Sequence, residues 1–160
     1  MPAGRGFLSM RDDIVIIGGG MVGASLVAAL LPVADELALS IAVVEAVAMP
    51  ASDLQQYQPS YDARATALAY GSRLLYEQMG VWQALAPQLA AIEHIHVSDK
   101  GHFGATRLHA HEEHVPALGY VVENHWLGQV LLNHIQQHEN AHCIDFICPA
   151  EVKQVTPEAE

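Results

Sequence analysis

The sequence predicts an α/β domain built around a parallel sheet, and three observations carry that prediction. Residues 14–17 form an uninterrupted β-branched run, which is typical of a parallel strand buried on both faces. A glycine-rich turn follows at residues 18–20, and residues 21–31 then carry Ala, Leu and Val at helical density. A second aliphatic run at residues 40–45 completes a strand–helix–strand unit, whose crossover is right-handed almost without exception.

The remaining elements follow from local composition and periodicity. Pro32 is expected to end the first helix, and Gly80 is expected to cap the C-terminus of a later one. Elsewhere the sequence predicts a flexible leader at 1–12, a loop at 49–61, helices at 63–79, 81–89 and 124–137, and strands at 92–97, 104–109, 120–122, 143–148 and 151–155.

Composition excludes several classes of function. The chain of 160 residues is 51% apolar and 16% charged, which is typical of a folded domain and not of a disordered chain. Its 7 Lys and Arg face 18 Asp and Glu, and the formal charge of -11 argues against nucleic-acid binding and electrostatic docking on anionic lipid. Residues 14–34 could span a bilayer by length, but their glycines and Pro32 argue against a transmembrane helix.

Neither the cysteines nor the histidines predict a disulfide or a metal site. Cys143 and Cys148 are too few for a disulfide framework and too far apart for a C-x-x-C metal pair, so free thiols in a reducing compartment are expected. The 10 His residues include a pair at His134 and His138, but none forms H-E-x-x-H. Zinc sites need three or four convergent ligands, so no metal is predicted.

The pattern Gly18-x-Gly20-x-x-Gly23, between a strand and a helix, carries the chemistry of the chain. The first glycine permits a tight turn, the second lets the backbone approach a pyrophosphate, and the third lets helix and strand pack closely. The helix N-terminus offers unpaired N–H groups and a partial positive charge to the phosphates. Glu45 ends the second strand, where a carboxylate accepts hydrogen bonds from ribose hydroxyls and repels a 2′-phosphate. A Rossmann-like site that disfavours NADP is therefore predicted.

Alternatives remain open at this point. The glycine pattern does not separate FAD from NAD, so the unit could serve an FAD- or NAD-linked oxidoreductase of another reaction type. It could also belong to a non-catalytic module that binds a dinucleotide or a protein partner. Asp62-x-Arg64 is expected to open the helix after the long loop, and Arg64 could either reach a nucleotide phosphate or remain a surface charge.

Several runs of the chain resemble the N-terminal part of the ubiquinone-biosynthesis FAD-dependent aromatic hydroxylases. Residues 14–23 look like the FAD fingerprint of that family, and Tyr-Asp-Ala-Arg-Ala-Thr-Ala-Leu at 61–68 looks like its D-x-R-x-x-A-L signature. Residues 75–82 look like the helix and Gly-Val-Trp turn that follow it. Residues 96–104 and 117–124 are most similar to a branch that acts on a polyprenylated methoxyphenol. The resemblance runs from about Ile14 to Val155.

The resemblance implies which residues hold FAD, although it identifies no catalytic residue. Glu45 would bind the adenosine ribose, and Arg64 would lie along the diphosphate or the ribityl chain. Asn124 would touch the cofactor from the start of its helix, and the backbone of Val152 would face the adenine. The pyrophosphate would be held by the turn and the first helical turn, namely by Gly18, Gly20, Met21, Val22 and Gly23.

The resemblance also implies the reaction. NADPH or NADH, bound elsewhere than at the glycine motif, would reduce FAD, and O2 would then be captured as a flavin C4a-hydroperoxide that hydroxylates a polyprenylated phenol. The implied protein is cytoplasmic and has no transmembrane segment. It would work at the inner face of the membrane by peripheral association, alongside other ubiquinone-biosynthesis proteins.

Members of the family are much longer than this chain. Residues 13–160 are therefore expected to be the N-terminal part of an FAD-binding domain, in which residues 101–116 belong either to a β-meander or to the start of a substrate-side β element. The family's Asp-Gly and Gly-Asp motifs, which hold the ribityl and flavin end, are missing, as is most of the substrate domain. By itself the chain is expected not to complete a flavin site.

Overall fold

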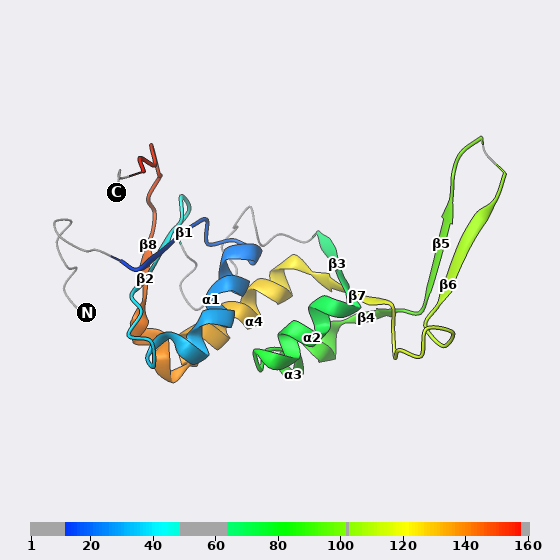
Figure 1. Cartoon of the computed structure of the whole chain (residues 1–160), viewed down its shortest axis with the longest axis horizontal. Helices are drawn as coiled ribbons and strands as arrows, with labels where there is room; N and C mark the ends of the chain where they lie inside the picture. The colour runs from blue at the N-terminus through cyan, green and yellow to red at the C-terminus, as the bar shows by residue number, and fades with distance from the viewer. Residues whose placement is uncertain (1–11, 49–63, 102, 158–160) are drawn as a thin grey trace.

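The structure is a computed structural model that describes residues 12–48, 64–101 and 103–157. A parallel sheet and two long helices form one end of the molecule, a small antiparallel sheet lies next to them, and a hairpin projects from the other end (Figure 1). In chain order the elements are β1 (Ile14–Ile17), α1 (Met21–Ala34), β2 (Ile41–Val44), β3 (Ala65–Ala69), α2 (Tyr70–Gln78), α3 (Trp82–Leu85), η1 (Ala86–Gln88), β4 (Ala90–Ile92), β5 (His94–Ser98), β6 (Ala105–His109), β7 (Gly119–Glu123), α4 (Asn124–Gln137), η2 (Glu139–Cys143) and β8 (Ile144–Ile147).

The parallel sheet has β2 in its centre, with β1 on one side and β8 on the other. Ile41 of β2 pairs with Ile14 of β1 and with Ile144 of β8, so segments from both ends of the chain meet in one layer. The strand–helix–strand unit and the α/β class predicted from the sequence are thereby confirmed.

The two long helices, α1 and α4, lie on one face of this sheet (Figure 1). Ile16 and Val43 are buried on that face, in one core with Leu31 of α1 and Leu131 of α4. On the opposite face Val15 and Ile17 are 55% and 59% exposed. The expectation that the first strand is buried on both faces is therefore wrong for the described structure, because α1 and α4 lie on the same side of the sheet (Figure 1).

Helix α1 continues past the point where the sequence predicts its end. Pro32 lies inside the helix, which runs on to Ala34. A proline in a helix interior removes one backbone hydrogen bond and crowds the preceding turn, which disfavours this conformation locally. Leu31 and Ala34 are both fully buried against the core, and this packing of the last turn outweighs the local preference.

The helix predicted over residues 63–79 is wrong in its first third. β3 occupies Ala65–Ala69, and only α2, Tyr70–Gln78, is helical. Antiparallel pairing with β7, from Ala65 opposite Glu123 to Ala69 opposite Gly119, overrides the helical propensity of the alanines. Gly119 permits this close approach, because a Cβ there would lie 2.6 Å from the Leu68 carbonyl oxygen. Gly80 has φ +74 just past α2, as a C-terminal cap glycine should.

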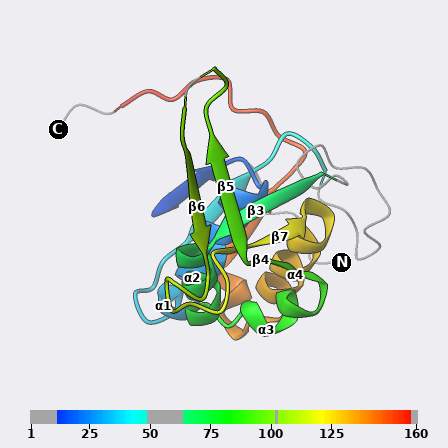
Figure 2. The same cartoon turned by 90° about the vertical axis from the view of Figure 1, so that its right-hand side faces the viewer.

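The strand predicted over residues 92–97 is divided between two sheets. β4 pairs with β7 in the three-stranded antiparallel sheet, whereas β5 pairs with β6 in a separate two-stranded sheet of the described structure. The predicted return strand is confirmed as β6. The β5–β6 hairpin projects away from the helices in both views (Figures 1 and 2), and Val97 on it is 58% exposed.

Helix α4 has the predicted bounds, Asn124–Gln137, and it packs its apolar face against α1 in the core. The predicted strand at 143–148 is confirmed as β8. The strand predicted at 151–155 is wrong, since these residues have no regular secondary structure. They follow Ala150, whose N–H donates to the Glu45 carbonyl at 2.8 Å.

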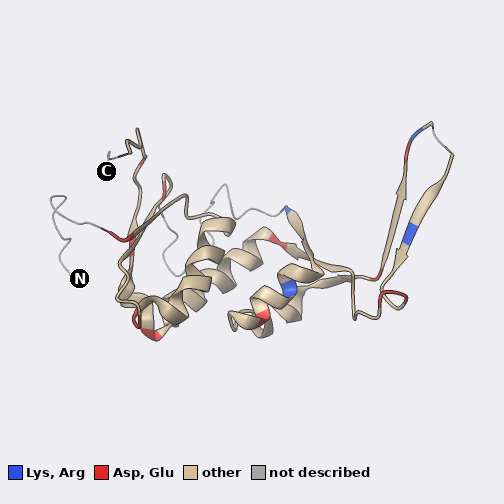
Figure 3. Ribbon diagram, viewed as in Figure 1, with Lys and Arg blue, Asp and Glu red and all other residues tan. Residues whose placement is uncertain are grey.

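Within residues 12–48, 64–101 and 103–157, no helix is both long enough and apolar enough to cross a membrane. Lys and Arg are few and are scattered over separate elements of the ribbon, without gathering on one of them (Figure 3). Cys143 and Cys148 are both free thiols, as the sequence predicts.

His134, in the last turn of α4, makes the stability of the fold depend on pH. Its Nε2 is buried and has no hydrogen-bond partner among the described residues, and its ring centroid lies 5.8 Å from that of His138. Burial, and then the charge of His138, lower the pKa of His134 from its usual value. At His134 the unfolded chain therefore binds protons more readily than the folded one as the pH falls below about 6.5, and the stability that the neutral ring contributes above that pH is lost.

We expect urea denaturation at about pH 5.5 to have a lower midpoint than at about pH 7.5, and His134→Gln to make this fall shallower. The control is His111→Gln, since the His111 side chain is 74% exposed. The assignment to His134 is wrong if the two variants show the same pH dependence as the wild-type chain.

Candidate dinucleotide-binding site

The glycine turn between β1 and α1 has a conformation and a packing that only glycine allows. Gly18 has φ +100, in the region that side-chain-bearing residues rarely adopt. A Cβ added to Gly23 would collide with the carbonyl oxygen of Gly18. Helix and strand are therefore as close as their backbones permit, and the turn leaves the start of α1 open to a ligand.

The N-terminus of α1 has no side-chain cap among the described residues, which suits the binding of an anion. Gly20 is the N-cap residue and has no side chain with which to cap the first N–H groups of the helix. The first turn contains no acidic residue. Because the helix dipole adds a partial positive charge at this end, the turn is suited to a phosphate or pyrophosphate.

The carboxylate of Glu45 lies against this turn. One oxygen accepts a hydrogen bond from the Gly19 N–H at 2.7 Å, and the other accepts one from the Val47 N–H at 2.9 Å. These two bonds hold the carboxylate at the carboxyl end of β2 beside the glycines. Each oxygen keeps further acceptor capacity, so the group can still bind a ribose hydroxyl.

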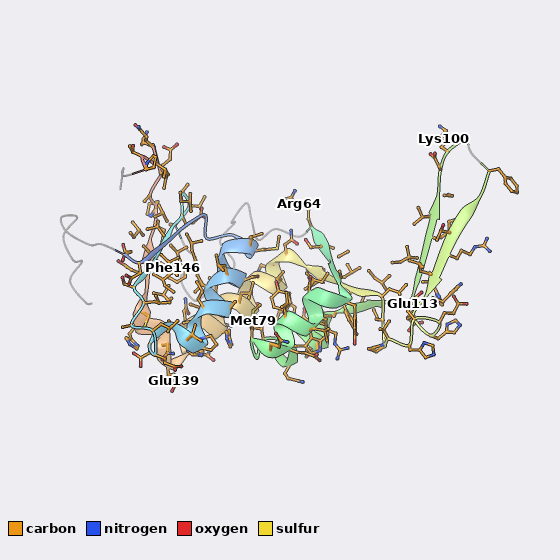
Figure 4. The ribbon with its side chains drawn as sticks, in the orientation of Figure 1. Arg64, Met79, Lys100, Glu113, Glu139 and Phe146 are labelled. Atoms are coloured by element: carbon orange, nitrogen blue, oxygen red, sulfur yellow. The ribbon has the colours of Figure 1, made fainter. Side chains whose placement is uncertain are left out.

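A cavity of about 560 Å³ opens at this point. Arg64 lines it from the start of β3, and Figure 4 shows Arg64 on the same side of the molecule as the N-terminal end of α1. The prediction that Arg64 opens a helix is wrong, because Arg64 directly precedes strand β3. Asp62 lies outside the described residues. The remaining lining residues come from β1, the turn, α1 and the end of β2: Ile16, Ile17, Gly18, Gly20, Met21, Val22, Gly23, Leu26 and Glu45.

A second cavity of about 230 Å³ adjoins the first, because Ile17, Gly18 and Glu45 line both. Val152 lines this second cavity together with Val44, Ala46, Ala150 and Glu151. The two cavities thus run from Arg64, past the glycine turn and Glu45, to Val152. Such an elongated arrangement suits a ligand with a phosphate in its middle and a ring at one end.

Asn124 lies apart from these cavities and belongs to the junction of β7 and α4. It is only 4% exposed, its backbone N–H donates to the Arg64 carbonyl at 2.8 Å, and its Oδ1 accepts from the Thr66 hydroxyl at 2.6 Å. Asn124 therefore helps to hold the Arg64 segment in place. Its predicted contact with a cofactor stays a prediction.

Sequence reasoning missed the apolar wall and one polar lining residue of the cavities. Ile17 and Leu26 form part of the wall of the first cavity, and Ala150 and Glu151 line the second. The segment after β8 reaches Glu45 only because β8 is the neighbour of β2 in the sheet. The chain order of the elements does not reveal that neighbour, so no local signal could have identified Ala150 or Glu151.

No protein-family model matches the chain. It is 32% identical over 124 residues to the ubiquinone hydroxylase UbiL of Rhodospirillum rubrum, and 31% identical over 126 residues to the 3-demethoxyubiquinol 3-hydroxylase of Escherichia coli. The chain is distantly related to ubiquinone hydroxylases. These two matches cover 77% and 79% of this chain but only 27% and 30% of the relatives, so the matched region spans less than a third of their length.

Solved structures of larger proteins share the fold. The chain superposes on pqsL from Pseudomonas aeruginosa with a TM-score of 0.61 at 16% identity, over 92% of this chain and 35% of that one. It superposes on the flavin-dependent monooxygenase PieE, in complex with FAD and substrate, with a TM-score of 0.55 at 13% identity, over 86% of this chain and 24% of that one. The fold is therefore that of part of the FAD-binding domain of flavin monooxygenases.

Proposed function

We propose that this chain provides the part of an FAD-binding domain that holds the adenosine diphosphate, in an FAD-dependent monooxygenase of ubiquinone biosynthesis. The observation that carries the proposal is the meeting of the glycine turn, the start of α1 and the Glu45 carboxylate at one cavity. The distant relatives named as ubiquinone hydroxylases support the reaction class.

The substrate proposed for the whole protein is a polyprenylated phenol, with O2 as the second substrate. Residues 96–104 and 117–124 favour 2-octaprenyl-6-methoxyphenol hydroxylase within this group. A polyprenyl tail calls for peripheral association with the inner face of the membrane and for other ubiquinone-biosynthesis proteins as partners. Bound FAD would supply the redox chemistry that places one oxygen atom of O2 on the ring.

The residues of the chain fit the adenosine-diphosphate half of FAD. Because Gly23 has no Cβ, α1 can begin close to the turn that follows β1. The uncapped N–H groups of α1 would bind the pyrophosphate. Glu45, held by the Gly19 N–H, would accept from the adenosine ribose. The exposed guanidinium of Arg64 would neutralise phosphate charge at the mouth of the cavity. The backbone at Val152 would face the adenine.

The carboxylate of Glu45 also affects where the nucleotide that donates electrons can bind. At this position it would repel the 2′-phosphate of NADPH. NADPH or NADH is therefore proposed to act from outside the glycine turn, as a donor of electrons to FAD and not as the resident nucleotide.

Competition binding tests the proposal. FAD and ADP are expected to bind the chain with dissociation constants within a factor of about three, because both present the same diphosphate and ribose. FMN, which lacks the adenosine, is expected to compete with neither. Isothermal titration calorimetry with FAD, ADP, FMN and NAD measures this. Tighter binding of NAD than of FAD, or displacement of FAD by FMN, would contradict the proposal.

A further inference from the structure

A second cluster of ligating side chains lies at the other end of α1 from the glycine turn. Asp35, the C-cap residue of α1, meets His142 and Cys143 of η2, and their ligating atoms all lie within 4.8 Å of one another. Helix α1 has 14 residues, so about 21 Å along its axis separates this cluster from the dinucleotide site. Figure 4 shows the two ends through Arg64 and Glu139, the first residue of η2.

The tautomer of His142 aims its second nitrogen at the other two ligands. Its Nδ1 lies 3.1 Å from the Glu139 carbonyl oxygen, which can only accept, so Nδ1 carries the proton. Nε2 then presents a lone pair to the Asp35 carboxylate at 3.3 Å and to the Cys143 sulfur at 3.5 Å. A lone pair facing a carboxylate at this distance is unfavourable unless a proton or a metal ion lies between them, and the neighbouring thiol makes a metal ion a ready choice. A backbone carbonyl on the far nitrogen is the usual support of a metal-binding histidine.

The distances between the ligating atoms fit a tetrahedral zinc ion. Zn–N and Zn–O bonds of about 2.05 Å and a Zn–S bond of about 2.3 Å give ligand separations of about 3.3 Å for N to O and about 3.6 Å for N to S. The separations in the structure are 3.3 Å from His142 Nε2 to Asp35 Oδ1 and 3.5 Å from Cys143 Sγ to His142 Nε2. Two of the three separations therefore match a shared ion, and all three ligating atoms lie within 4.8 Å of one another.

The surroundings of the cluster favour a cation and hold its two halves together. The C-terminus of a helix carries partial negative charge, so a carboxylate there is unfavourable unless a cation offsets it. Asp35 is at that position in α1. Asn140 of η2 donates from Nδ2 to the Leu31 carbonyl at 2.8 Å, which docks η2 on the last turn of α1. The side chains of His142 and Asp35 are 64% and 66% exposed, so water can complete the coordination.

We propose that Asp35, His142 and Cys143 bind a divalent zinc-type ion that clamps the end of α1 to the segment leading into β8. Imidazole, thiolate and carboxylate are the ligand types that Zn²⁺ takes in proteins. The clamp joins positions 107 residues apart in the chain. It is independent of the dinucleotide site and stabilises the same sheet, because β8 follows Cys143 directly.

Titration with Co²⁺, a spectroscopic substitute for Zn²⁺, tests the clamp on the full chain. The wild-type chain is expected to bind one equivalent and to show a near-ultraviolet thiolate-to-cobalt charge-transfer band. Cys143→Ser is expected to lose the band, and His142→Ala to weaken binding at least about tenfold. Cys148→Ser is the matched control, since Cys148 lies at the other end of β8, and it is expected to behave as the wild-type chain does.

Thermal unfolding provides a second readout that needs no enzymatic activity. Saturating Zn²⁺ is expected to raise the Tm of the wild-type chain and of Cys148→Ser by on the order of 5 °C, and to leave that of Cys143→Ser unchanged. Circular dichroism confirms that each variant is folded. A wild-type chain without the charge-transfer band, or equal loss of the band in both cysteine variants, would overturn the proposal. The cluster would then be an ion pair of Asp35 with a protonated His142.

Discussion

Replacing Gly23 with Ala is expected to destabilise the chain by about 3 kcal/mol, the upper part of the range for overpacked sites. The new Cβ would collide with the Gly18 carbonyl oxygen, which is a backbone atom and cannot rotate away. Gly18 itself has φ +100, so the turn cannot easily adopt another conformation. Helix α1 must therefore move away from β1, and the donors at its N-terminus move with it. Urea denaturation followed by circular dichroism measures the loss.

The matched control is Gly71→Ala in α2. A Cβ there meets nothing within 4 Å, and the position is helical. Alanine in a helix interior is favoured over glycine by up to about 1 kcal/mol, so this variant should be neutral or more stable. Equal stability of the Gly23 and Gly71 variants would show that the close approach of α1 to the turn does not exist in solution.

Replacing Glu45 with Ala is expected to weaken ADP binding by at least about tenfold and to cost about 2 kcal/mol of stability. The substitution removes the acceptor for the Gly19 and Val47 N–H groups, which are part-buried. It also removes the proposed partner of the ribose. Glu45→Gln should be intermediate, because one amide oxygen can replace only one of the two carboxylate acceptors.

Calorimetric titration with ADP at constant salt measures the effect of the Glu45 substitutions. Glu113→Gln is the control for the loss of one negative charge: Glu113 is exposed and lies near the base of the hairpin, far from Arg64 (Figure 4). The proposed role of Glu45 fails if Glu45→Ala and Glu113→Gln bind ADP equally well. If a Glu45 variant binds ADP more weakly but binds Co²⁺ at the Asp35 cluster as the wild-type chain does, the two proposed sites are independent of each other.

The parts of the site that the sequence predicts are those whose determinants are local. Gly18, Gly20 and Gly23 lie within one turn and the start of one helix, and the structure places Glu45 beside them because β2 pairs directly with β1. Helix α4 was equally predictable, since a continuous apolar stripe from Leu127 to Ile135 determines both its extent and its buried face.

The errors occur where partners distant in the chain decide the conformation. Residues 65–69, Ala-Thr-Ala-Leu-Ala, suit a helix in isolation, and only pairing with β7 makes them a strand. Pro32 is tolerated because Leu31 and Ala34 are buried on either side of it. The Asp35, His142 and Cys143 cluster has no sequence signature, since its ligands are 107 residues apart and meet only after α1 and η2 have packed.

The pairing of β2 with strands from both ends of the chain also affects how the chain folds during its synthesis. Ile41 pairs on one edge with Ile14, which precedes it, and on the other with Ile144, which the ribosome adds much later. Pairing between such distant segments closes a long loop and is slow. We therefore expect the first half of a nascent chain to stay protease-sensitive and dependent on chaperones until β8 has emerged.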